Sequence, residues 1–107
     1  MKQISPKELA AWLADASRKK PQLLDVREPW EWDTARIEGA QLIPMREVPA
    51  RVAELDPDQD VVAICHHGGR SQQVAMFLEK NGFAKVHNLQ GGVDAWSRTV
   101  DPAVPLY

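Results

Sequence analysis

The sequence predicts a single α/β domain over residues 1–107, with a mostly parallel central sheet covered by helices on both faces. Three observations support this prediction. Residues 22–27, 61–64 and 85–89 are short runs with the character of strands. Stretches with apolar residues at three- and four-residue spacing alternate with them, a pattern typical of a parallel sheet that is buried on both faces. A length of 107 residues allows one hydrophobic core and is too short for two.

The first predicted element is a helix that begins at Ser5-Pro6. Ser5 is placed to cap it, Pro6 suits the first helical position, and Glu8 completes a capping box. The basic cluster at residues 18–20 is expected to end this helix, because positive charge suits a helix carboxyl end.

Residues 22–27 are predicted to form the first central strand. On a strand of period two, Asp25 and Arg27 point to the same side near its carboxyl end. A short helical turn follows from Pro29, and residues 37–44 are expected to form a turn and a short strand that proline stops.

The second half of the chain repeats the alternation. Residues 48–55 have helical apolar spacing, residues 61–64 read as a buried strand, and a helix is predicted from Ser71 to Asn81-Gly82. Another short strand follows at residues 85–89. Gly91-Gly92 then opens a last helix, and an irregular tail is expected from about residue 98. This tail is either a packed strap or a loose end.

Composition narrows the function classes. The net charge of −2 gives no reason to expect a nucleic acid or an anionic membrane as partner, and no apolar run approaches the ~20 residues that span a bilayer. The amino terminus lacks the apolar core of a secretion signal, which predicts a cytoplasmic location. The single cysteine excludes an internal disulfide and fits a reducing compartment.

That cysteine, Cys65, stands where the apolar strand stops and a loop, residues 65–71, leads into a helix. Ligands of open α/β sheets bind at this end of the strands. Two glycines allow a tight loop with inward amides, Arg70 adds a permanent cation, and Ser71 is expected to cap the helix. Amides, helix dipole and arginine all favour a thiolate, so the loop predicts a nucleophilic cysteine with an anion-binding cradle.

The same residues also allow plainer interpretations. A free cysteine is often only a small buried hydrophobe, but Cys65 lies at the strand end rather than inside it. His66 and His67 either rim the pocket and meet an anionic substrate or are exposed loop residues. A metal site formed by Cys65, these histidines and His87 is not expected, because neighbouring residues on a tight loop rarely converge on one ion and the spacing of a metal motif is absent.

Four segments together resemble the rhodanese family of sulfurtransferases in its single-domain form. They are residues 23–32, 37–44, 65–71 and 89–96, in the family's order and over almost the whole chain. The resemblance implies a rhodanese-like fold with a five-stranded sheet. One departure is Arg36, which stands where the family usually has a histidine before Ile37 and which concerns local packing rather than the chemistry.

The resemblance implies that Cys65 is catalytic and that the loop binds the substrate through His66, His67, Gly68, Gly69, Arg70 and Ser71. It further implies ion pairs for Asp25 and Arg27. The expected activity is that of a thiosulfate sulfurtransferase. A small anionic donor such as thiosulfate gives a sulfur to Cys65, and cyanide, a thiol or an acceptor protein takes it. No cofactor, metal, nucleic acid or membrane is expected.

Two other functions fit parts of the pattern. A phosphatase or arsenate reductase also uses cysteine and arginine around an anion, but cysteine-dependent phosphatases place five residues between them and this loop has four. A binding or regulatory module of the same fold would be expected to lack the cysteine or its cradle, and this chain has both. The sequence therefore favours sulfur transfer.

Overall fold

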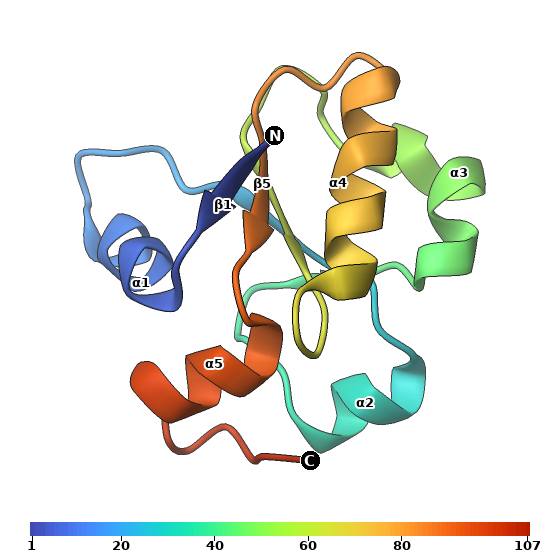
Figure 1. The fold of residues 1–107 in the computed structure, drawn as a ribbon. Coiled ribbons are helices and arrows are strands. Elements are labelled where there is room, and N and C mark those ends of the chain that lie inside the picture. Colours follow the sequence, from blue (N-terminus) through green and yellow to red (C-terminus); the bar gives the residue numbers. More distant parts are fainter.

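The computed structural model describes residues 1–107 and contains a five-stranded sheet in which every neighbouring pair is parallel (Figure 1). The strands are β1 (Lys2–Ile4), β2 (Gln22–Asp25), β3 (Gln41–Leu42), β4 (Val61–Ile64) and β5 (Val86–Leu89), in the order β1-β5-β4-β2-β3. The helices are α1 (Pro6–Ala14), α2 (Pro29–Thr34), α3 (Val48–Arg51), α4 (Gly69–Lys80) and α5 (Gly92–Thr99), with 3-10 turns at Met45–Glu47 and Val52–Glu54 on either side of α3. The predicted α/β fold with a parallel five-stranded sheet is confirmed.

The central strand β4 shows how the two faces are covered. Val61, Ala63 and Cys65 pack into a cluster with residues of α3 and α4, whereas Val62 and Ile64 pack into a second cluster with residues of α1 and α5. All five residues are at most 1% exposed. A strand buried on both faces reads as a continuous apolar run, which is why this strand is evident from sequence.

Local signals explain the helix starts. Ser5 caps α1 through its side chain, and Glu8 returns a bond to the Ser5 amide, so the predicted capping box is confirmed. The second helix has an equivalent box in which Glu28 and Glu31 bond each other's amides, with Pro29 at the first helical position.

Several boundaries differ from the prediction. The helix α4 begins at Gly69 rather than Ser71, and the helix predicted over residues 48–55 is α3 followed by a 3-10 turn. The helix α1 ends at Ala14, before the basic cluster, because the Asp15 carboxylate accepts bonds from the amide and hydroxyl of Ser17 and so forms a turn.

The strand β1 is not among the segments that the sequence predicts. It has three residues and lies at the sheet edge beside β5, and so short a strand has no readable period.

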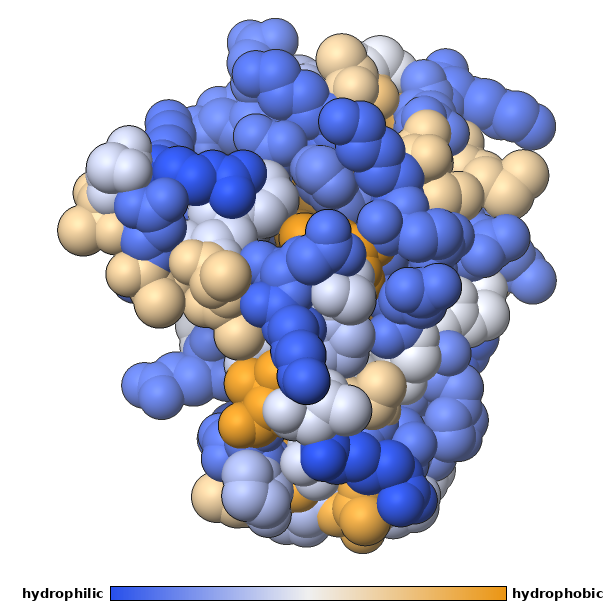
Figure 2. Space-filling model, turned by 60° about the vertical axis from the view of Figure 1, so that its left-hand side comes forward, coloured by the Kyte–Doolittle hydropathy of each residue, from blue (hydrophilic) through white to orange (hydrophobic).

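The hydropathy of the surface is consistent with a core whose apolar side chains are buried. Figure 2 shows a mostly hydrophilic face on which hydrophobic colour appears in small separate areas. None of the helices is long and apolar enough to span a membrane.

Candidate active site

The thiol of Cys65 lies directly after β4, on the face of the sheet that α4 covers. The residue is 1% exposed. Its Sγ accepts a hydrogen bond from the Gly68 amide at 3.0 Å and lies 3.3 Å from the Ser71 hydroxyl. The loop that follows therefore wraps around the sulfur, as the sequence predicts.

The helix α5 holds this loop from behind. The amide of Val93 donates to the Cys65 carbonyl at 2.9 Å, and the amide of Asp94 donates to the His66 carbonyl at 3.1 Å. Gly92 has φ +62°, and a Cβ there would lie 2.3 Å from the Cys65 carbonyl oxygen. Only glycine permits an approach this close, so Gly92 is part of the construction of the site.

The same contacts orient the loop amides. In a trans peptide the carbonyl and the N–H point in opposite directions. The two carbonyls face α5, so the amides of His66 and His67 face away from it. Gly68 makes the turn into α4 at φ +104°, a conformation that other residues rarely adopt.

Several amides of the loop and the first turn of α4 have no hydrogen-bond partner in the protein. They include those of His66, His67, Gly69, Arg70 and Ser71. Such free N–H groups carry the positive end of the helix dipole and favour a bound anion.

Ser71 corrects one expectation from the sequence. It does not cap α4, because Gly68 occupies the N-cap position and Ser71 lies inside the first turn. Its buried hydroxyl donates to Asn88 Oδ1 at 2.5 Å, and Asn88 Nδ2 donates to the Gly68 carbonyl at 3.1 Å. Asn88 thus ties β5 to the loop. In the sequence, Asn88 is only a polar residue within a short strand, which is a weak signal for a role at the site.

Arg70 lies on the other side of the loop and is engaged by a carboxylate that sequence reasoning missed. Its two terminal nitrogens donate to the two oxygens of Glu31 at 2.7 and 2.9 Å. The side chain of Glu31 is 5% exposed, whereas that of Arg70 is 39% exposed. The hydrogen bonds from Arg70 outweigh burial and lower the pKa of Glu31 to about 2.

Glu31 is one member of a chain of polar side chains. Its Oε2 also accepts from the Tyr107 hydroxyl at 2.8 Å, and that hydroxyl accepts from Arg27 at 2.7 Å. Arg27 in turn pairs with Asp25 at 2.7 Å, and both are fully buried. The expected ion pair of Asp25 and Arg27 is confirmed, whereas no sequence signal points to Tyr107.

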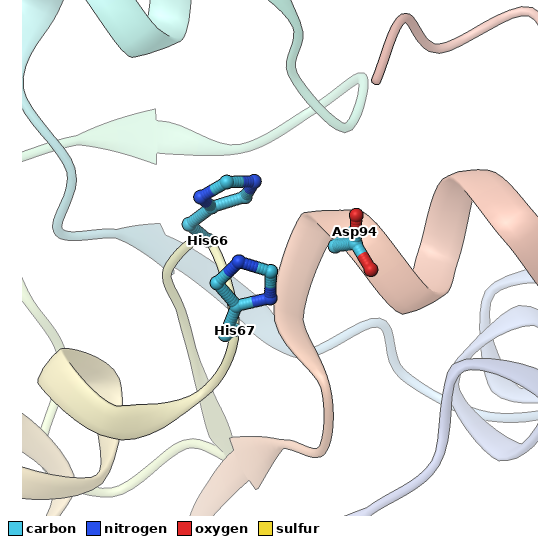
Figure 3. Close-up of side chains that lie close together, drawn as sticks. All are labelled: His66, His67 and Asp94. Atoms are coloured by element: carbon cyan, nitrogen blue, oxygen red, sulfur yellow. The ribbon is translucent and has the colours of Figure 1, made fainter. Parts of the chain in front are cut away.

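The two histidines have different surroundings (Figure 3). His66 is half-buried and lies between the ring of Tyr107 and the ring of His67, each 3.9 Å away between centroids. Burial lowers the pKa of His66 and so favours its neutral ring. His67 is exposed and lines a cleft beside Gly68 and Gly69 that no hydrophobic residue lines.

A third group joins the histidines at the mouth of the loop. A carboxylate oxygen of Asp94 and one ring nitrogen of each histidine lie within 4.8 Å of one another (Figure 3). These residue types are metal ligands, so this is where the chain could hold a divalent ion. The two rings are tilted at 34° to each other with centroids 3.9 Å apart, so we expect one ring to turn before both nitrogens could bind one ion.

Comparisons with known proteins agree on one family. Residues 5–99 match the family described as rhodanese-like domain. A sulfurtransferase of Allochromatium vinosum is 37% identical over 95% of this chain and 94% of its own length. The thiosulfate sulfurtransferase GlpE of Pseudomonas aeruginosa is 35% identical over 77% of this chain and 74% of its own.

A crystal structure of a rhodanese-like domain protein from Staphylococcus aureus has 32% sequence identity and a TM-score of 0.85, and it covers 100% of this chain and 99% of that one. Other curated relatives are longer, and this chain spans 38% or 26% of their length. The sequence motifs and the fold agree with these comparisons. The chain belongs to the rhodanese-like family, whose members include sulfurtransferases.

Proposed function

We propose that this protein is a sulfurtransferase that carries a sulfane sulfur as a persulfide on Cys65, with thiosulfate or a similar small anion as donor. One observation carries the proposal: a lone thiol lies inside a loop in which the amides of neighbouring residues have no protein partner. A persulfide is an anion one atom longer than the thiolate. Free amides of the loop can donate hydrogen bonds to that charge.

The reaction has two displacements. The Cys65 thiolate attacks the outer sulfur of thiosulfate, a new S–S bond forms, and the S–S bond of the donor breaks with its electron pair leaving on sulfite. Cyanide or a thiolate then attacks the outer sulfur of the persulfide and restores the Cys65 thiolate. The chain has one cysteine, so the acceptor in the second step is another molecule.

The surroundings of the loop favour a small polar anion. The cleft lined by His67, Gly68 and Gly69 contains no hydrophobic residue. Glu31 uses two of the five N–H groups of Arg70, so the others can donate to an oxyanion at the half-exposed guanidinium. Burial favours the neutral ring of His66, which can contribute a hydrogen bond to the donor. The relative from Pseudomonas aeruginosa, a thiosulfate sulfurtransferase, is in line with this donor.

The size of the loop argues against phosphoryl transfer. Four residues separate Cys65 from Arg70. A loop this short suits one added sulfur atom better than a phosphoryl group with three equatorial oxygens. We therefore expect no turnover of an aryl phosphate by this thiol.

The intact mass of the protein tests the proposal directly. We expect thiosulfate to add the mass of one sulfur atom and cyanide to remove it. The nearly isosteric Cys65→Ser variant should show neither change while keeping its thermal unfolding midpoint. Mercaptopyruvate and p-nitrophenyl phosphate are the comparison substrates.

Each outcome decides between functions. A sulfur gain from mercaptopyruvate alone would change the donor and keep the persulfide. A gain that persists in Cys65→Ser would refute the assigned nucleophile. No gain from either donor, together with Cys65-dependent release of p-nitrophenol, would replace sulfur transfer by phosphatase chemistry.

A further inference from the structure

The carboxyl-terminal segment packs against the candidate site. Beyond α5 the chain turns back, with Val104 buried in the cluster that α1 and α5 share and its carbonyl accepting from the Ser97 hydroxyl. Figure 1 shows the last residues beside α2, the helix that carries Glu31. Of the two forms open for this tail, a packed strap is the one observed.

The strap brings Tyr107 to the junction of two ion pairs. Its hydroxyl accepts from Arg27 at 2.7 Å and donates to Glu31 at 2.8 Å, so both of its hydrogen-bonding roles are used. Its ring stacks on His66 with 9° between planes and meets the edge of Trp30 at 5.7 Å. Burial raises the pKa of Tyr107 to about 12, which keeps the hydroxyl proton available for donation to Glu31.

The two ends of this chain of groups differ in burial. Asp25 and Arg27 are fully buried at the end of β2, whereas the side chain of Arg70 is 39% exposed. Glu31 holds Arg70 by two hydrogen bonds, one to each carboxylate oxygen. Apart from Arg70, the only hydrogen-bond partner of Oε2 is the Tyr107 hydroxyl. The Glu28 amide fixes only the other oxygen. Tyr107 is therefore the connection between the rigid pair and the carboxylate that orients Arg70.

We propose that Tyr107 is a positioning residue for binding of the anionic sulfur donor: its hydroxyl fixes Glu31 and through it the Arg70 guanidinium, while its ring holds the side chain of His66, the second residue of the Cys65 loop. This inference rests on the proposed function. Tyr107 touches neither the thiol nor the reacting atoms, so its contribution is to the affinity for the donor rather than to the displacement itself.

Two substitutions separate the hydroxyl from the ring. Tyr107→Phe keeps the stack on His66 and removes only the bonds to Arg27 and Glu31. We expect the KM for thiosulfate to rise about three- to tenfold with kcat nearly unchanged, because one charge-linked hydrogen bond orients Arg70. Tyr107→Leu removes the ring as well and should raise KM further. Leu106→Ala changes the neighbouring, exposed residue of the strap and should leave both constants as they are.

A second readout needs no sulfur transfer. Titration of the Glu31 side-chain carboxyl by NMR should show its pKa higher in Tyr107→Phe than in the unmodified protein, and unchanged in Leu106→Ala. If the unmodified protein transfers no sulfur, the proposed function fails while this titration still tests the connection from Tyr107 to Glu31.

The proposal is overturned if Tyr107→Phe leaves both KM and the Glu31 titration unchanged. It is also overturned if kcat falls while KM stays constant, since Tyr107 would then act in the displacement. Should Tyr107→Leu unfold, the phenylalanine variant and its titration decide alone.

Discussion

The two sides of the Cys65 loop are held by different groups: backbone amides on one side and charged side chains on the other. On the sulfur side, the Gly68 amide donates to Sγ, neighbouring loop amides have no protein partner, and α5 fixes the loop by bonding the carbonyls of Cys65 and His66. On the Arg70 side, side chains from β2, α2 and the carboxyl-terminal strap meet in one line of hydrogen bonds. The sulfur side depends on close backbone approach, whereas the Arg70 side depends on charge pairing. We therefore expect the sulfur side to be sensitive to added side-chain volume and the Arg70 side to be sensitive to the loss of a charged partner.

The largest effect is expected on the sulfur side, from Gly92→Ala. The added Cβ would lie 2.3 Å from the Cys65 carbonyl oxygen at a positive φ, so α5 must move off the loop. Overpacking and backbone strain together should lower the free energy of unfolding by about 3 kcal/mol or more, and sulfur transfer should be lost.

Gly39→Ala is the matched control for this change. Gly39 also has a positive φ, but a Cβ there meets nothing within 4 Å. Backbone strain alone should cost about 1 kcal/mol, with kcat and KM unchanged. Urea unfolding of the two variants gives the comparison, and equal losses would show that the contact between α5 and the loop is not what Gly92 protects.

A smaller effect is expected on the Arg70 side, from Arg70→Ala. The substitution leaves the Glu31 carboxylate, 5% exposed, with only the Glu28 amide and the Tyr107 hydroxyl as partners. We expect a loss of about 2 kcal/mol in the free energy of unfolding at pH 7, together with a raised KM for thiosulfate. Arg70→Lys restores the charge without the two-pronged contact and should fall in between. An unchanged KM in Arg70→Ala would remove Arg70 from donor binding.

The same division explains what sequence could and could not predict. The cysteine loop is contiguous, so its glycines, cation and strand-to-helix switch are visible together in residues 65–71. The predicted cap at Ser71 is wrong, because serine suits both a cap and the first turn of a helix, and only the position of Gly68 decides between them. Tyr107 lies 80 residues from Arg27, and no periodicity connects them. Glu31 stands within a segment that resembles the family, but its partner Arg70 is 39 residues away and only the fold brings them together.

The smallest effect is the acid dependence of the Arg70 side, and it tests whether the loss in Arg70→Ala acts through Glu31. The folded-state pKa of Glu31, about 2, lies below its ordinary value of 4.5, so its contribution to stability is complete above about pH 4.5 and is lost as the pH falls toward 2. The difference in unfolding free energy between the unmodified protein and Arg70→Ala should therefore narrow by about 1 kcal/mol between pH 7 and pH 3. Arg51→Ala, which breaks the exposed pairs with Glu47 and Glu54, provides the control and should show a smaller change. Urea titrations at the two pH values measure both differences. A gap for Arg70→Ala that stays constant would mean that its cost is lost packing of the arginine stem rather than an unpaired Glu31 carboxylate.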